Sequence, residues 1–395
     1  MEKDNRELLR IRLVFLLEFF GLSVGSSFNT LYARQMAETL SGTFAETVGV
    51  QTLTALPMMF LTVMMLLGVL FSGRIAKQRR YFEAYMRFSA VVVILGMLIR
   101  GLSFRYWILL VGASFHGFGY GLFFIGIRYY AYLSPKEDTV NTLAFVNSGA
   151  FAGTCMGTII GGMLSGSLSY RMVYLITAAF LFLPLLLLRR APDERLMRVG
   201  ELRDILKVLR NKKLIALSLC IVIPLFSCTA FTSYMVPLDV ADFGYSATVI
   251  SALLLGEGIL TAYLGPAMTR LVTKKLPRVL QLTLFCLMYA VPIALYALFR
   301  NMPVLILTMV ILGVADSFGL NVLTDIFVQT KGKEEYNDNT ALIAYMLMSR
   351  AGMVLAPVTV MISPNPIWLS ILVVGGLLLY TLFSAMGSGG REKAL

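Results

Sequence analysis

The sequence GAFAGTCMGTIIGG, residues 149–162, places glycines four positions apart within an apolar stretch. Gly149, Gly153, Gly157 and Gly161 fall on one face of a helix, because four residues make slightly more than one turn. A glycine face lets a second helix approach closely, and such packing is typical of helices inside membranes. The stretch therefore predicts a membrane helix packed tightly against a neighbour.

Composition supports a membrane location for the whole chain. The 395 residues are 58% hydrophobic and only 14% charged, with a mean hydropathy of +0.78, which is too apolar for a soluble domain of this size. A bilayer core of about 30 Å needs about 20 apolar residues per helix. Twelve segments qualify as predicted spans: 12–33, 47–72, 82–101, 104–128, 140–165, 170–189, 214–237, 246–270, 279–299, 302–327, 339–362 and 366–386.

The basic residues behind the net charge of +12 are distributed unevenly among the predicted loops. Of the 34 Lys and Arg residues, 28 lie at the two ends of the chain or in loops that follow even-numbered spans. This asymmetry follows the positive-inside rule, so we expect both termini in the cytoplasm of a bacterial cell, with the protein integral to its inner membrane. It also makes nucleic acid an improbable partner. Five arginines fall in the other loops and one lies within a span: Arg34, Arg100, Arg105, Arg171, Arg300 and, intramembrane, Arg350.

A charged interruption at 190–213 divides the spans into six and six. We predict an N-terminal half over 1–189, a cytoplasmic linker over 190–213 and a C-terminal half over 214–395. Within the linker, Leu202, Ile205, Leu206 and Leu209 have helical spacing, which favours a short helix on the membrane surface. A solvated linker explains the same residues.

The two halves match each other at a shift of about 200 residues. Gly153 and Gly157 of the fifth span correspond to Gly352 and Ala356 of the eleventh, and Gly119 of the fourth corresponds to Gly319 of the tenth. Together these matches indicate a parallel repeat of six helices.

Over essentially its whole length the chain resembles the major facilitator superfamily. The set Gly149, Gly153, Gly157, Thr158, Gly161 and Gly162 resembles the fifth-helix motif of its drug/proton antiporters, with Thr158 in place of the usual proline. Generic packing of small residues is the alternative. The turn GRIAKQRR, which begins with Gly73 and Arg74, resembles the family's loop between spans two and three, although Lys77 stands near the expected aspartate.

The resemblance implies an all-α membrane protein with twelve transmembrane helices in two six-helix, pseudo-symmetric halves. It also implies that helices 3, 6, 9 and 12 face lipid while the others surround a cavity. Five ionisable residues lie deep within spans 1, 4, 8, 10 and 11, and charge at that depth is expensive and usually functional. These residues are Glu18, His116, Glu257, Asp316 and Arg350.

Helical geometry refines this set of candidates. Glu18, Gly25 and Asn29 would form one stripe on the first span, lining the cavity or bonding to a neighbouring helix. Asp325 is nine residues from Asp316 and therefore points to the opposite side of the tenth span.

Arg350 requires a carboxylate partner at matching depth, either Asp316 or Glu257. The acid left over becomes a candidate proton carrier, for which we select Glu257. The competing interpretation is that Glu257 is a structural acid that shares Arg350. His116, the only histidine, either relays protons or hydrogen-bonds as a neutral imidazole between helices.

The sequence therefore predicts a secondary transporter that works by alternating access, with proton-coupled export of small amphipathic or cationic compounds as the leading function. Proton- or sodium-coupled uptake of a sugar, organic acid or peptide is an alternative, and a membrane sensor that binds without transport is another. No catalytic motif indicates an enzyme. We expect a monomer in the lipid bilayer, with a small-molecule substrate and protons as partners and without cofactor or metal.

Topology is directly testable. Single cysteines placed within 190–213 should react with a membrane-impermeant reagent only from the cytoplasmic side, because the basic loops lie there. Single cysteines placed between Asp239 and Gly244 should react only from outside. Reversed labelling would overturn the orientation of every loop.

Overall fold

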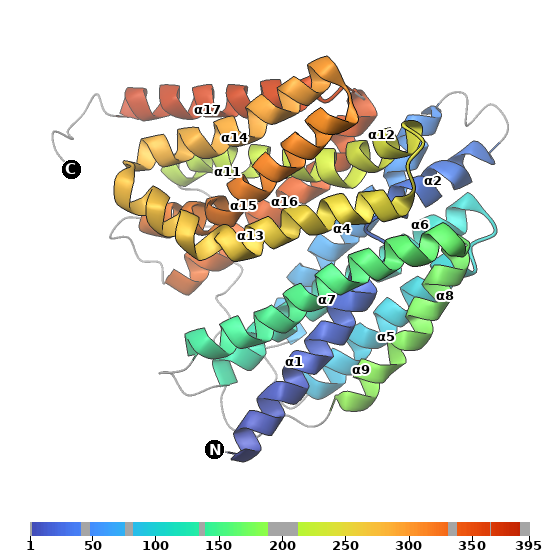
Figure 1. The fold of residues 1–395 in the computed structure, drawn as a ribbon. Coiled ribbons are helices and arrows are strands. Elements are labelled where there is room, and N and C mark those ends of the chain that lie inside the picture. The colour runs from blue at the N-terminus through green and yellow to red at the C-terminus, as the bar shows by residue number, and fades with distance from the viewer. Residues whose placement is uncertain are drawn as a thin grey trace. The chain divides into compact units, whose positions relative to one another are not determined.

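The computed structural model describes residues 2–40, 48–75, 82–133, 139–188, 212–330, 338–363 and 365–387. Every regular element in these ranges is a helix (Figure 1). Contacts between Cα atoms group the chain into two compact units. The first unit comprises Met1–Val199 with Pro237–Leu255, and the second comprises Gly200–Val236 with Gly256–Leu395.

Helices of the first unit are α1 (Glu2–Ser23), α2 (Asn29–Glu38), α4 (Val50–Ile75), α5 (Phe82–Gly101), α6 (Tyr106–Leu133), α7 (Thr139–Ser167), α8 (Tyr170–Phe180) and α9 (Phe182–Leu187). This unit also takes most of α12 (Val236–Asp242) and the start of α13 (Ala247–Lys275). The second unit holds α11 (Lys212–Ala230), the π-helix η2 (Phe231–Met235), the rest of α13, α14 (Arg278–Phe299), α15 (Met302–Thr330), α16 (Asp338–Ile362) and α17 (Ile367–Gly387).

Each predicted span coincides with one helix or with consecutive shorter helices. By length and composition, seven stretches of the described residues are able to cross a membrane: Val50–Phe71, Ala84–Gly101, Tyr170–Leu187, Leu217–Asp242, Ala247–Gly265, Arg278–Phe299 and Met302–Phe327. The count of twelve stays a prediction. The surface helix predicted within 190–213 lies largely outside the described residues, and so do the side chains of Gly73 and Arg74 at the end of α4.

Proline explains two of the interruptions in these helices. Pro184 has no N–H to donate to the carbonyl of Phe180, and α8 ends at that residue. Pro237 likewise has no N–H to donate within its helix, and the residues just before it form the π-helix η2. These residues therefore bend their spans at fixed points.

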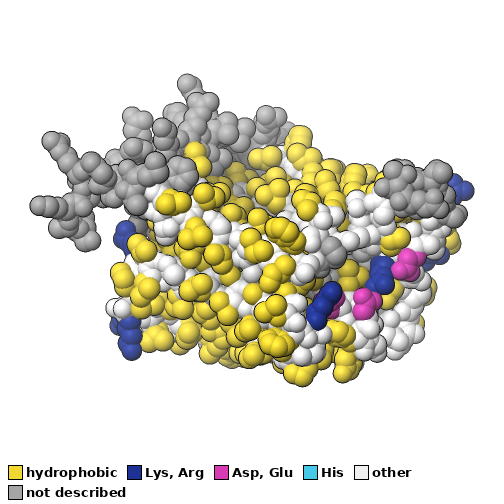
Figure 2. Space-filling view, turned by 90° about the horizontal axis from the view of Figure 1, so that it is seen from above, with side chains coloured by type: hydrophobic (Ala, Val, Ile, Leu, Met, Phe, Trp, Pro, Cys, Tyr) yellow, Lys and Arg dark blue, Asp and Glu magenta, His cyan; other side chains and the backbone are white. Residues whose placement is uncertain are grey.

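The described surface is strongly apolar (Figure 2). On α14, for example, the exposed side chains after Arg278 are those of hydrophobic residues: Val279, Leu280, Leu287, Val291, Leu295, Leu298 and Phe299. A soluble protein rarely exposes a continuous apolar face of this length. The surface is therefore suited to contact with lipid.

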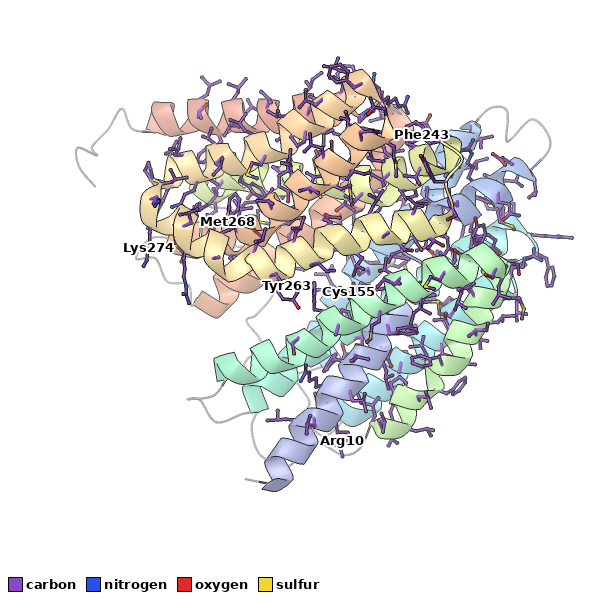
Figure 3. The ribbon with its side chains drawn as sticks, viewed as in Figure 1. Arg10, Cys155, Phe243, Tyr263, Met268 and Lys274 are labelled. Atoms are coloured by element: carbon purple, nitrogen blue, oxygen red, sulfur yellow. The ribbon has the colours of Figure 1, made fainter. Side chains whose placement is uncertain are left out.

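Basic residues flank the apolar helices. Arg10 lies in the first half of α1 and Lys274 lies in the last turn of α13 (Figure 3). Of the five arginines assigned to the outer loops, Arg34 pairs with Glu38 at 3.1 Å and with Asp242 at 2.7 Å. The guanidinium of Arg171 lies 4.5 Å from the ring centre of Phe104.

The assignment of Arg100 to an outer loop is wrong, because Arg100 lies in the last turn of α5 and only 1% of it is exposed. Its charge is held inside the protein and does not report on which side of the membrane the loop lies.

The glycine face of α7 lies against α1, and the two helices run side by side in Figure 1. A Cβ atom added at any of the four glycines would approach the opposing backbone closer than 3.0 Å, which real side chains do not tolerate. The opposing residues are also four apart: Arg12, Leu16 and Phe20 of α1, and Val24 in the turn that follows it. The two segments therefore pack backbone to backbone over about three turns.

Gly162 lies on a different face of α7 and is directed toward the start of α13. A Cβ there would overlap Ser251, whose hydroxyl donates to the carbonyl of Thr158 at 2.9 Å. Thr248 donates to the carbonyl of Gly162 at 3.4 Å. The end of the glycine motif is thus joined to α13 by two side-chain hydrogen bonds.

Gly157→Ala should destabilise the protein by about 1–3 kcal/mol, because its methyl group would overlap the backbone of Phe20. Gly166→Ala on the same helix is the matched control, since its Cβ would meet only Thr248 Oγ1 at an ordinary 3.6 Å. Thermal unfolding in detergent measures both. Equal melting temperatures for the two variants would show that α1 and α7 are farther apart than described.

Candidate proton-coupling and substrate-binding sites

Four side chains from four helices converge in the second unit. Cys228 comes from α11, Glu257 from α13, Tyr289 from α14 and Asp316 from α15, and we call them the carboxylate cluster. The Tyr289 hydroxyl donates to Oδ1 of Asp316, and Sγ of Cys228 lies 4.0 Å from Oδ2. The sulfur of Cys228, one carboxylate oxygen of Glu257 and one of Asp316 all lie within 4.8 Å of one another.

Burial increases the energetic importance of the cluster. Tyr289 is fully buried and only 8% of Cys228 is exposed, while Glu257 and Asp316 are half-buried. Charges that approach each other in a medium of low dielectric constant interact far more strongly than they do in water. The two carboxylates therefore repel each other strongly unless a proton or a cation lies between them.

Two glycines of α15 allow the helices around the cluster to approach each other. A Cβ at Gly313 would lie 2.9 Å from the carbonyl oxygen of Glu257, so α13 and α15 are close at the level of the acids. Gly319, three residues beyond Asp316, accommodates the ring of Phe285 on α14. The cluster therefore depends on small residues in α15 as well as on its polar side chains.

The structure brings the two acids together but does not describe the side chain of Arg350. Its backbone lies in α16, so pairing of Arg350 with Glu257 or Asp316 stays a prediction. Asp325 is exposed, unlike half-buried Asp316, as the half-turn between them on α15 requires. Cys228, Glu257 and Asp316 also offer a donor set that a divalent cation accepts, and the prediction that no metal binds stays open.

A second polar group lies in the first unit around Arg100, and we call Asn29, Arg100, His116 and Tyr174 the arginine cluster. Arg100 Nη1 lies 2.9 Å from Nδ1 of His116, and Nη2 donates to Oδ1 of Asn29 at 2.8 Å. The Tyr174 hydroxyl donates to the same Asn29 oxygen, and the guanidinium lies 4.4 Å from the Tyr174 ring centre. All four residues are at least nine-tenths buried.

This geometry assigns the tautomer of His116. A guanidinium has donors only, so Nδ1 of His116 must accept and cannot carry a proton. The imidazole is therefore neutral in this conformation, with its proton on Nε2. The hydrogen-bonded neutral imidazole is the role of His116 that this arrangement supports, and proton relay through His116 stays an untested prediction.

Neutral groups stabilise the charged guanidinium of Arg100. Among the described residues no carboxylate forms an ion pair with it, and its Nε atom has no hydrogen-bond partner. Two acceptors and an aromatic face replace the usual acid. The cluster also joins the start of α2 to α5, α6 and α8.

Glu18 stands apart from both clusters. It is fully buried on α1, and neither carboxylate oxygen has a hydrogen-bond partner among the described residues. An ionised carboxylate in that position would be very unfavourable, so we expect the protonated acid. The predicted stripe of Glu18, Gly25 and Asn29 is wrong as helix geometry, because α1 ends at Ser23 and a turn over 24–28 separates Asn29 from it.

Sequence reasoning did not select Arg100, Tyr174, Cys228 or Tyr289. Arg100 was counted with the outer loops because it lies close to the end of a predicted span. One available signal was Gly112, which faces Arg100 across the α5–α6 hairpin and is one helical turn before His116. Tyr289 gave no signal, since the sequence contains 18 tyrosines and most of them lie in apolar segments.

Residues 11–357 match the sequence profile of the Major Facilitator Superfamily. The chain belongs to this family. It is therefore a membrane protein of a transporter family, with a small molecule as its class of substrate, and it is not an enzyme. Membership does not place it in the drug/proton antiporter branch.

Solved structures share the fold at low sequence identity. A bacterial homologue of the human lysosomal transporter Spinster, in an inward-facing and occupied conformation, has a TM-score of 0.74 at 14% identity, with 99% of each chain covered. The nucleoside transporter NupG has a TM-score of 0.71 at 15% identity, with 98% of this chain and 99% of that chain covered. A D-xylose–proton symporter has a TM-score of 0.70 at 14% identity, with 94% and 96% covered. No curated protein matches the chain significantly.

His116→Asn should preserve stability and pH dependence, because the amide oxygen replaces Nδ1 as the acceptor for Arg100. His116→Leu should destabilise the protein by about 1–3 kcal/mol, because it leaves a buried N–H of Arg100 without a partner. Thermal unfolding of the purified variants measures the difference. If His116→Asn and His116→Leu lower the stability by the same amount, Nδ1 does not accept from Arg100.

Proposed function

We propose that this protein is a proton-coupled secondary transporter that works by alternating access, with export of small amphipathic or cationic compounds as the leading function. In this proposal it spans the membrane twelve times, as two six-helix halves with both termini in the cytoplasm. The distribution of basic residues supports the orientation.

The proximity of Glu257 and Asp316 is the observation that carries the proposal. One carboxylate oxygen of each residue lies within 4.8 Å of one of the other residue, in helices apolar enough to cross a membrane. Two carboxylates at this distance are stable when they share one proton, and they become unfavourable when that proton leaves. Such a pair binds or releases a proton in response to a small change in its surroundings. This property is required for coupling to a proton gradient.

The same pair supports a cationic substrate. With one shared proton the two acids keep a single negative charge, and a cation is able to replace that proton. Competition between a proton and a cation for one site is the physical basis of exchange. If Arg350 reaches the pair, the doubly ionised form becomes less costly and the exchange shifts to lower pH.

Uptake of a polar solute is the alternative function. Proteins of the same fold include the D-xylose–proton symporter, the nucleoside transporter NupG and a POT family transporter in complex with a peptide conjugate. The arginine cluster would suit a neutral polar or anionic solute better than a cation, because it carries a fixed positive charge. A sensor that binds without transport is the third possibility.

Transport in sealed proteoliposomes with an imposed pH gradient tests the proposal. The probes are ethidium as a lipophilic cation, and a sugar, a nucleoside and a dipeptide as polar solutes. Glu257→Gln should abolish accumulation driven by the gradient, because it removes an exchangeable proton. Counterflow of the same probe should persist, since it needs no net proton movement. Binding of a probe without movement would indicate the sensor.

Asp325→Asn is the matched control, because it removes an exposed carboxylate from the helix that carries Asp316. Its gradient-driven transport should equal that of the unmodified protein. If Asp316→Asn rather than Glu257→Gln abolishes the pH dependence, the two acids exchange roles. If neither does, coupling through this pair is wrong, and a uniporter or a sodium-coupled carrier becomes the better interpretation.

A further inference from the structure

We propose that Tyr289 holds Asp316 as the ionised member of the acid pair and thereby fixes the exchangeable proton on Glu257. The inference rests on the proposed function only in calling this proton the coupled one. Tyr289 is then a positioning residue, because it acts through Asp316 and does not carry the proton.

The hydrogen bonds to the two acids are unequal. Asp316 receives the Tyr289 hydroxyl on Oδ1 and faces the Cys228 thiol, 4.0 Å away, on Oδ2. The Glu257 side chain has Asp316 itself as its hydrogen-bond partner, while the Glu257 backbone carbonyl accepts from Thr261 at 3.0 Å. Donors stabilise an ionised carboxylate over a protonated one. The single proton of the pair therefore favours Glu257, which then becomes a further donor toward Asp316.

The placement of Tyr289 is built into the packing of α14. One turn earlier, the Phe285 ring occupies the space left by Gly319 of α15, with its centre 4.7 Å from that of Tyr289. This contact brings α14 within reach of Asp316. The opposite face of α14 is apolar and exposed, so Tyr289 carries its hydroxyl inward from a helix whose other side is suited to lipid.

Other groups that face Asp316 are consistent with this assignment. Cys228 comes from α11 and Glu257 from α13, while α16 contributes Tyr345, which is close enough to sense the charge of Asp316. The side chain of Arg350, also on α16, is outside the described residues. Tyr289 is the residue among the described ones whose hydroxyl bonds directly to a carboxylate of the pair.

The proton balance is simple. In the loaded state Glu257 is a neutral acid and Asp316 is an anion that accepts from Tyr289. Release of the proton leaves two anions, of which Asp316 keeps its donor. Asp316 is ionised in both of these states, so loss of the Tyr289 donor destabilises both of them. It does not destabilise the alternative loaded state with the proton on Asp316, and without Tyr289 the proton therefore moves toward Asp316.

Infrared titration of the reconstituted protein, without any substrate, follows the C=O band of the protonated acid. In the unmodified protein the band should belong to Glu257, whereas in Glu257→Gln a band of Asp316 should titrate at lower pH. Adding Tyr289→Phe to Glu257→Gln should raise the midpoint of the Asp316 band by about one unit or more, because a hydrogen bond to the charged form of Asp316 is lost. An unchanged Asp316 midpoint on adding Tyr289→Phe would overturn the inference.

Two further variants separate electrostatics from structure. Adding Tyr296→Phe to Glu257→Gln removes another fully buried hydroxyl from α14 and should leave the Asp316 midpoint in place, whatever it does to stability. Adding Tyr289→Phe to Asp316→Asn should produce no further shift if Tyr289 acts only through the charge of Asp316. A full shift in that double variant would show that Tyr289 acts on Glu257 through another route.

Failure of this inference is distinguishable from failure of the proposed function. If Tyr289→Phe moves the Asp316 midpoint while gradient-driven transport of every probe by the unmodified protein is absent, the proton assignment holds and the transport proposal fails. If transport is proton-coupled and lost in Glu257→Gln, but the Asp316 midpoint does not move on adding Tyr289→Phe, the function holds and the role of Tyr289 is wrong.

Discussion

An ionisable side chain in an apolar medium must find its partners within the protein, and the arrangement of both units follows from this constraint. In the first unit Arg100 of α5 meets His116 of α6. In the second unit Tyr289 of α14 meets Asp316 of α15. His116 and Asp316 are 200 residues apart, which is the shift at which the two halves of the sequence match. The partner comes from the preceding helix in both cases, although its chemistry differs.

Glycine residues let the helices approach closely enough for these side-chain contacts to form. Gly112 lies against the backbone of Arg100, and Gly319 accommodates Phe285 one turn from Tyr289. Larger residues at these positions would separate the helices and leave each polar group without its partner. The packing glycines and the buried polar residues are therefore one constraint, because a close helix approach is what allows a short hydrogen bond to form across the interface.

Sequence reasoning located most of the ionisable side chains but not their partners. Glu257, Asp316, His116 and Glu18 were evident because charge within an apolar run is rare. Arg100 and Tyr289 were not, since which residues meet depends on the rotation and vertical offset of neighbouring helices, and neither is encoded in one helix alone. The stripe through Asn29 failed for a related reason. It assumed a continuous helix, whereas a turn between α1 and α2 sets the direction of Asn29 independently of Glu18.

The arginine cluster is basic and the carboxylate cluster is acidic, and this difference suggests different roles for the two units. Arg100 stays charged at any physiological pH, and its acceptors are neutral, so the arginine cluster changes little when a proton arrives. The carboxylate cluster holds two acids and one directly bonded donor, so the location and release of its proton depend on small rearrangements. A moving helix that alters the distance from Tyr289 to Asp316 would change which acid holds the proton. In the proposed transporter, the second unit is therefore the place where helix movement and proton binding are most easily linked.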